Sequence, residues 1–146
     1  MRILIAVEDT YFAGPQIEFV SNHNWPGEVT FNILHVVPPL PADLAQEDNS
    51  FIVDVGNRRL ERGKSLVKEA AQKLGLKFPD AKIIQSVEHG YAKEKILEVI
   101  ENWEADVAIL GSHGRRELTR TMIGSVSTAV LTYALCSVLV VRPPKL

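Results

Sequence analysis

Five short apolar runs without polar alternation constrain this chain more than any other feature. The runs are Ile3–Val7, Val29–Val37, Lys82–Val87, Asp106–Leu110 and Val138–Val141. A strand with one face in water alternates apolar and polar residues, whereas a strand that is covered on both faces does not. The runs therefore predict five strands of a parallel sheet that carries helices on both sides.

The segments between these runs have the spacing of amphipathic helices, with apolar residues three and four positions apart. The positions that we expect to face the core are Leu60, Val67, Ala70, Ala71 and Leu74 between Arg59 and Leu74; Ala92, Ile96, Val99, Ile100 and Trp103; and Val126, Val130, Tyr133 and Ala134. Alternating strands and helices predict a doubly wound α/β fold. In such folds ligands bind outside the carboxyl ends of the strands, where the strand order reverses.

Two further segments lie between the first three strands. Pro15 suits the first turn of a short helix, which the turn-forming run Asn22–Gly27 must end. The run Pro38–Ser50 holds three prolines and little periodicity. It predicts either a mobile flap or extended crossover, or a solvated connector without a role.

Length and charge narrow the possible functions. The 146 residues fit one domain that spans 1–146, and 46% hydrophobic and 23% charged residues are typical of a globular chain. The formal net charge is −2 without a basic block, which argues against nucleic acid as a partner. The first apolar run is too short for a signal-peptide core or a membrane span. We therefore expect a cytoplasmic protein without membrane contact.

Two glycine–serine runs follow the fourth strand, and they are Gly111-Ser112-His113-Gly114 and, nine residues later, Gly124-Ser125-Val126-Ser127. The glycines let the main chain leave the strand and let a ligand approach it closely. Gly124 directly precedes a helix, whose first amides have no internal partner and whose dipole favours a phosphate. Ser125 suits the N-cap, and Ser125 and Ser127 offer hydroxyl donors. This stretch predicts an anion seat at the carboxyl end of the sheet.

The spacing Gly-x-x-Gly, nine residues, Gly-Ser resembles the nucleotide motif of the ATP-binding branch of the universal stress protein (UspA-like) family. Arg2–Val7, Leu34–Val37 and Val138–Arg142 resemble the family's first, second and last strands. The resemblance implies a Rossmann-like, doubly wound five-stranded parallel sheet of order 3-2-1-4-5, with ATP, AMP or ADP and Mg²⁺ as ligands. It places the adenine near Ala6, Val7 and the main chain of Val36; the ribose near Glu8 and Gly111; and the phosphates near Ser112, His113, Gly114, Gly124, Ser125, Val126 and Ser127.

One triplet departs from the family pattern. Family members usually carry Asp-Gly-Ser or a similar triplet after the first strand, and this chain has Glu8-Asp9-Thr10. Glu8 is one methylene longer than the usual aspartate, so its contact to the base or ribose must shift. Asp9 adds a second negative charge, which weakens nucleotide binding unless it points away or holds a divalent cation.

Other kinds of site fit the sequence less well. A response-regulator receiver domain needs an aspartate after the third strand, where this chain has Glu88-His89-Gly90. His35, His89 and His113 lie near strand ends and form an alternative metal site, although none has the short spacing of a zinc motif. Runs of the types GxxxxGK[ST], GxGxxG after the first strand and GxSxG are absent from the sequence.

Three arginines occupy the excursion between the two glycine–serine runs. Arg115, Arg116 and Arg120 either clamp a terminal phosphate or solvate a loop. The sequence alone leaves both interpretations open.

Taken with the resemblance, these features predict a stress-response regulator that binds ATP or another adenine nucleotide and changes state with occupancy. Two alternatives remain, a slow ATPase or phosphotransfer enzyme and a nucleotide-free interaction module of the same fold. No catalytic residue is placed by motif. The family also implies a homodimer through the last strand, at Val138, Leu139, Val140 and Val141, and an apolar strand at a sheet edge tends to find a partner.

Overall fold

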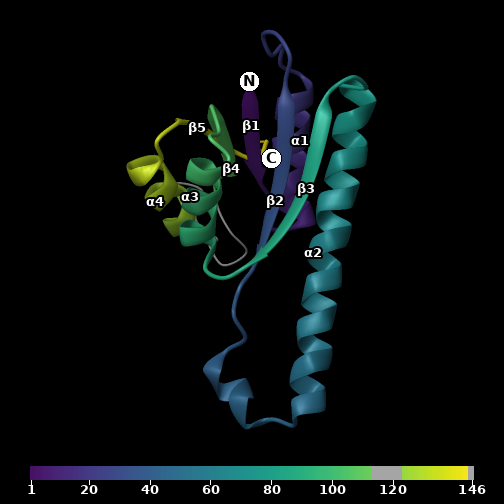
Figure 1. Cartoon of the computed structure of the whole chain (residues 1–146), viewed down its shortest axis with the longest axis vertical. Helices are drawn as coiled ribbons and strands as arrows, with labels where there is room; N and C mark the ends of the chain where they lie inside the picture. The colour runs from purple at the N-terminus through teal and green to yellow at the C-terminus, as the bar shows by residue number, and fades with distance from the viewer. Residues whose placement is uncertain (113–122, 145–146) are drawn as a thin grey trace.

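The computed structural model describes residues 1–112 and 123–144 of the chain. Its elements alternate as the sequence predicts (Figure 1). In chain order they are β1 (Arg2–Ala6), α1 (Thr10–Ser21), β2 (Thr30–Val37), the 3₁₀ helix η1 (Ala42–Gln46), α2 (Asn49–Lys77), β3 (Lys82–His89), α3 (Ala92–Asn102), β4 (Val107–Gly111), α4 (Ser125–Tyr133) and β5 (Ser137–Val141).

The five strands form one parallel sheet in the order β3-β2-β1-β4-β5. This confirms the predicted doubly wound fold and the order 3-2-1-4-5. The strand order reverses at β1, which pairs with β2 on one side and with β4 on the other. β3 and β5 are the two edge strands.

Two helices cover each face of the sheet (Figure 1). On the face beneath α1 and α2, the core includes Ile3, Ile5, Phe31, Ile33 and Leu74. On the face beneath α3 and α4, it includes Leu4, Leu34, Ile96, Ile100 and Val130. Successive strand residues point to opposite faces, and both faces are covered, which is why the runs show no polar alternation.

α1 begins earlier than the position of its proline suggests. Asp9 is the N-cap, and its carboxylate accepts a hydrogen bond from the amide of Phe12 at 2.9 Å. Pro15 therefore lies in the second turn and not in the first, so our placement of Pro15 was wrong. The helix ends at Ser21 as expected, and the Trp25 indole donates to Val20 O at 3.1 Å just beyond its end.

α2 is much longer than the predicted segment Arg59–Leu74. It begins at Asn49, so it takes up the end of the predicted connector Pro38–Ser50, and η1 lies within that connector. Its buried residues begin only at Gly63, against His35 and Val87 near the carboxyl ends of β2 and β3. The part of α2 before Gly63 therefore projects past the sheet by a helix length of about 20 Å (Figure 1).

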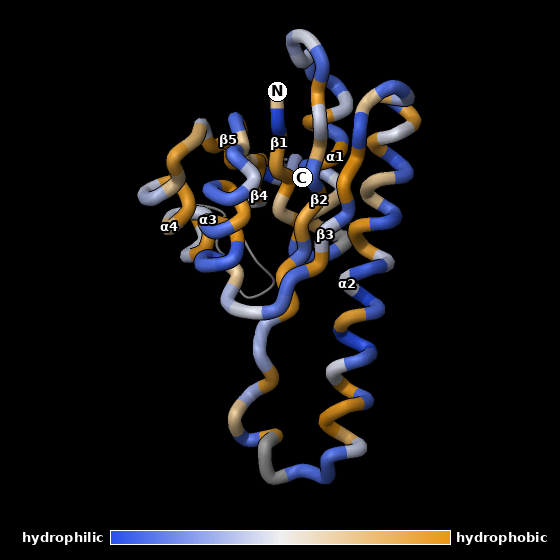
Figure 2. Tube along the Cα trace, viewed as in Figure 1, coloured by the Kyte–Doolittle hydropathy of each residue, from blue (hydrophilic) through white to orange (hydrophobic). Residues whose placement is uncertain are grey.

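The projecting half of α2 contains no buried residue, and its apolar residues Ile52, Val55 and Leu60 are only half-buried. Hydrophobic and hydrophilic residues alternate along it (Figure 2), and Phe51 and Val53 are exposed. Within the described residues, no helix is both long enough and apolar enough to cross a membrane.

Candidate functional site

The predicted site residues gather where the strand order reverses. β1 ends at Ala6 and the neighbouring β4 at Gly111, and Ile5 pairs with Ile109 just before these ends. Val36 follows on β2, which pairs with β1 up to Leu34. The carboxyl ends of three adjacent strands thus form one side of the candidate site.

The buried residue Gln16 of α1 contacts the ends of two of these strands. Its side-chain amide donates to Ala6 O at 2.8 Å and to Ile109 O at 3.4 Å. It therefore links the main chains of β1 and β4 near their carboxyl ends. We did not predict this residue as part of the site. The available signal is an uncharged polar side chain between Pro15 and Ile17 in a mostly apolar segment, which on its own does not show what the amide contacts.

A set of hydrogen bonds ties the end of β4 to the end of β5 and to the start of α4. Ser112 N donates to Val141 O at 3.0 Å, and Gly124 N donates to Ser112 O at 2.7 Å. The Ser127 hydroxyl donates to Gly111 O at 2.6 Å. These bonds form a neck that holds the two glycine–serine runs together, and Ser112 and Gly124 are buried within it.

This neck changes the roles that we predicted for the two serines of α4. Gly124 and not Ser125 is the N-cap, with φ −60° and ψ 160°, and no side chain of the described residues caps the helix. Ser127 is buried, and its hydroxyl is committed to Gly111 O instead of facing a ligand. Ser125 is the first helical residue, and it is exposed.

The first amides of α4 lie ahead of the helical hydrogen-bond ladder. The first helical bond runs from Thr128 N to Gly124 O at 2.9 Å. The amides of Ser125, Val126 and Ser127 therefore have no acceptor inside the helix, and they point toward its positive end. This arrangement can bind an anion at the carboxyl end of the sheet.

On the other side of the site, the chain continues from β1 through Val7 and Glu8. Val7 N donates to Leu34 O at 2.8 Å, and His35 Nδ1 lies 2.9 Å from Val7 O. Because a carbonyl oxygen only accepts, Nδ1 carries the proton of this bond. His35 thereby fixes the main chain of Val7, while Glu8 is exposed at the surface.

Asp9 does not stand as a second free charge in the site. Its side chain caps α1 through the Phe12 amide, at the end of the helix where a negative charge is favourable. The Asp9 carboxylate therefore points to the start of α1, and its effect on nucleotide affinity stays a prediction. The carboxylate serves the fold of α1.

Part of the predicted site lies outside the described residues, namely His113, Gly114, Arg115, Arg116 and Arg120. The proposed metal site of His35, His89 and His113 depends on one of them. Within the described residues, no group of three histidine, cysteine, aspartate or glutamate side chains could hold a metal ion.

Comparisons with known proteins agree with the fold and with the family resemblance. The model of the universal stress protein family matches residues 1–142. Universal stress protein A homolog 2 of Coxiella burnetii is 34% identical over 142 residues, which cover 97% of this chain and 94% of that protein.

Solved structures share the architecture at lower identity. Universal stress protein UspA from Lactobacillus plantarum aligns with a TM-score of 0.75 at 20% identity, over 97% of each chain. A universal stress protein family protein from Arabidopsis thaliana, solved with AMP bound, aligns with a TM-score of 0.69 at 16% identity, over 99% of this chain and 92% of that one. The extent of the family match and the identity to the Coxiella relative show that this chain belongs to the universal stress protein family.

Proposed function

We propose that this protein binds an adenine nucleotide, ATP, ADP or AMP, at the carboxyl ends of β1, β2 and β4, and that occupancy sets its regulatory state. The observation that carries the proposal is the start of α4. There the amides of Ser125 and Val126 precede the hydrogen-bond ladder beside the exposed Ser125 hydroxyl. Such amides and the helix dipole favour a phosphate.

The base and ribose would bind on the opposite side of the candidate site, near Ala6, Val7, Val36 and Glu8. The bonds of Val7 to Leu34 and His35 support this arrangement because they hold the main chain in place before any ligand arrives. The Arabidopsis relative with AMP bound supports an adenine nucleotide as the ligand class. The proposal includes a cytoplasmic location, where adenine nucleotides are made and consumed, and Mg²⁺ as the counterion of bound ATP.

A regulatory role fits the described residues better than phosphotransfer. Hydrolysis requires a group that orients water in line with the terminal phosphate. The exposed carboxylate of the site, Glu8, is assigned to the ribose end, and Asp9 is committed to the α1 cap. A bound nucleotide then acts as a signal by favouring one conformation over another.

Two substitutions at position 125 test the phosphate contact. Ser125→Ala removes only the hydroxyl, whereas Ser125→Pro also removes the amide. Proline is well tolerated at the first helical position, and the extended ψ of Gly124, 160°, suits a residue before proline. Hydrogen bonds to charged groups contribute about 1.5–3 kcal/mol. We therefore expect Ser125→Pro to weaken ATP binding by about tenfold or more in calorimetry with Mg²⁺.

Adenosine is the matched ligand control because it lacks phosphates. Its affinity should be the same for the wild type and for Ser125→Pro. The ATP affinity of Ser125→Ala should lie between the ATP affinities of those two proteins. Equal ATP affinity in all three proteins would refute the phosphate contact at α4. An absence of ATP binding to the wild-type protein at millimolar nucleotide would refute the proposed function itself.

We also propose that a second copy of the chain pairs along β5. β5 is an edge strand, and Leu139 on it is partly exposed, so its unpaired main chain and apolar side chains can accept a partner strand. Light scattering at tens of micromolar protein should give the mass of a dimer. Leu139→Lys should give a monomer because it introduces a charge at the edge.

A further inference from the structure

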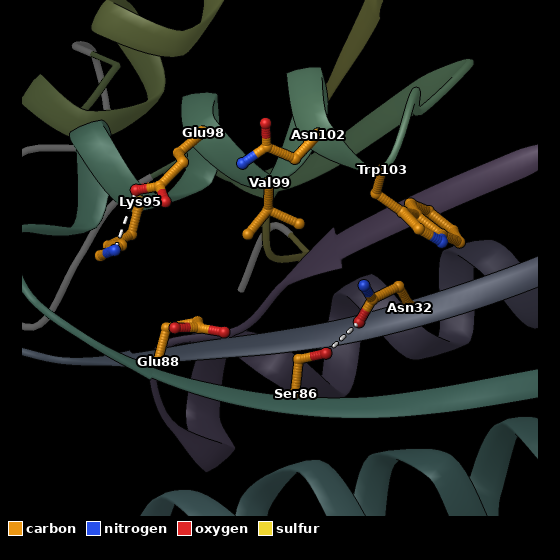
Figure 3. Close-up of a pocket in the computed structure, with 8 residues that line it drawn as sticks. All are labelled: Asn32, Ser86, Glu88, Lys95, Glu98, Val99, Asn102 and Trp103. Atoms are coloured by element: carbon orange, nitrogen blue, oxygen red, sulfur yellow. Dashed lines mark hydrogen bonds and ion pairs between the residues drawn. The ribbon is translucent and has the colours of Figure 1, made fainter.

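A polar trough between β3 and α3 lies on the α3–α4 face of the sheet (Figure 3). Its Glu88 end is next to Val36, which pairs with Glu88 between β2 and β3. We call it the α3 trough. Its volume is about 270 Å³, and its lining includes Asn32 of β2, Ser86 and Glu88 of β3, and Lys95, Glu98 and Trp103 at α3. None of the residues that line it belongs to the predicted nucleotide site.

Asn32 gives the α3 trough an unsatisfied donor. The residue is only 5% exposed, and its Oδ1 accepts a hydrogen bond from the Ser86 hydroxyl at 2.8 Å. Its amide nitrogen has no acceptor within the described part of the chain and points away from Ser86 toward α3 (Figure 3). A buried amide without an acceptor is costly, so this position favours an oxygen atom from a bound molecule.

The other end of the α3 trough carries an excess of negative charge. Lys95 Nζ donates to the Glu98 carboxylate at 2.9 Å, so these two charges balance each other. The half-buried Glu88 carboxylate makes no hydrogen bond or ion pair within the described residues, and it acts on Lys95 only through space. This end therefore favours a cation.

The strand register sets the distance between these two groups. Asn32 pairs with Ile84, and Val36 pairs with Glu88, so Asn32 and Glu88 are four strand residues apart, about 13 Å. The two side chains cover part of this span. The apolar surfaces of Val99 and Trp103 lie along the α3 side and can cover methylene groups.

We propose that the α3 trough binds a linear aliphatic molecule with an ammonium group for Glu88 and an oxygen acceptor for the Asn32 amide. A connecting chain of about five carbons matches the remaining span. The site requires no nucleotide, and the inference stands whether or not the seat at α4 binds one.

The test uses ω-amino alcohols of increasing length, from 3-aminopropan-1-ol to 7-aminoheptan-1-ol, with the full-length protein. Binding is followed by NMR at the Asn32 side-chain amide and the Trp103 indole N–H. We expect 5-aminopentan-1-ol to bind more tightly than the shortest and longest members. The neutral analogue 1,5-pentanediol should bind at least about tenfold more weakly, since it lacks the charge that pairs with Glu88.

Two variants separate the site from general charge effects. Glu88→Gln should reduce the affinity for 5-aminopentan-1-ol by about tenfold. Glu94→Gln removes an exposed charge of α3 that lies outside the trough, and it should leave the affinity unchanged. The proposal is overturned if the diol binds as tightly as the amine, if both variants lose affinity equally, or if no amino alcohol shifts the Asn32 and Trp103 signals. The first and last outcomes need only the wild-type protein, so a variant that failed to fold would not obscure the result.

Discussion

The two faces of the sheet differ in what they bury. Beneath α1 and α2, the second strand contributes Phe31, which is fully buried and packs on Phe78 with ring centroids 5.2 Å apart. Its neighbour Asn32 points to the opposite face, where it meets Ser86 in the α3 trough. Adjacent residues of one strand thus serve a close-packed core on one side and a polar recess on the other.

This difference distinguishes the face that stabilises the fold by close packing from the face that can bind a ligand. The long helix α2 covers β2 and β3 on one face, and apolar side chains fill the space. On the other face, β3 places Ser86 and Glu88 beside α3, and the space between them stays open. A recess that contains polar groups can accept a ligand, whereas a filled core cannot.

Substitutions at Phe31 and Asn32 should show the largest contrast. Phe31→Ala leaves a cavity in the filled core, and we expect it to lower the free energy of unfolding by about 3–5 kcal/mol. Asn32→Ala removes one hydrogen bond to the half-buried Ser86 hydroxyl at the wall of an existing recess, so its cost should be about 1 kcal/mol. Urea denaturation measures both values. Equal costs would show that the two faces are equally packed.

Two glycines of α2 test how far the filled core extends along that helix. A Cβ at Gly63 would lie 2.7 Å from the His35 ring, whereas a Cβ at Gly56 would meet no atom within 4 Å. Overpacking costs about 1–3 kcal/mol, and alanine favours a helix over glycine by about 0.5–1 kcal/mol. Thermal denaturation should therefore show Gly63→Ala destabilised by about 1 kcal/mol and Gly56→Ala stabilised by about 0.5 kcal/mol. A destabilised Gly56→Ala would mean that the projecting half is also packed.

Substitutions of Ser127 and Ser125, at the start of α4, should differ less in their effect on stability. Ser127→Ala removes the hydrogen bond to Gly111 O within the buried neck, and we expect a loss of about 1 kcal/mol in the free energy of unfolding. Ser125→Ala changes an exposed side chain that caps nothing, so chemical denaturation should detect little change. The opposite ranking would contradict the assignment of Ser127 to the neck.

The smallest effect concerns the projecting end of α2. The hydrogen bond from the Ser50 hydroxyl, followed by that from the Ser50 amide, lowers the pKa of the exposed Asp48 carboxyl. Because the pKa is lowered in the folded state, the cap stabilises the helix at pH values above the ordinary pKa of aspartate. This stabilisation is lost as the pH falls through the lowered pKa. The NMR shift of the Ser50 amide should follow this titration. Asp48→Asn, which keeps a capping oxygen, should abolish the pH dependence.

Much of this architecture could be predicted because a strand that is buried on both faces has an apolar sequence without polar alternation. The unalternating runs identified all five strands, and the apolar stripe identified α2 only from about Arg59, where the helix covers the sheet. Its beginning at Asn49 was missed because no residue of this helix before Gly63 is buried, so the apolar pattern there is weaker. Tyr133 was expected in the core from its spacing, yet it is 70% exposed, because α4 ends there and turns toward β5.

For the candidate site, the sequence indicated a place in the fold but not the contacts of its residues. The glycine–serine runs indicated the end of β4 and the start of α4 correctly. The partners of Asp9, Gln16 and Ser127 could not be inferred, since each contacts a main-chain group whose position depends on the folded neighbourhood. In the α3 trough, Asn32 and Ser86 are 54 residues apart in the chain, and only the pairing of β2 with β3 brings them together.

The sequence by itself determined the parallel sheet, its two covered faces and the stretch most suited to an anion, because hydrophobic period and glycine placement act locally along the chain. The tertiary structure alone decided which hydroxyls and carboxylates remain available. Each polar group near a strand end can bond either to the main chain or to a ligand, and only the packed arrangement of strands and helices shows which partner lies within reach.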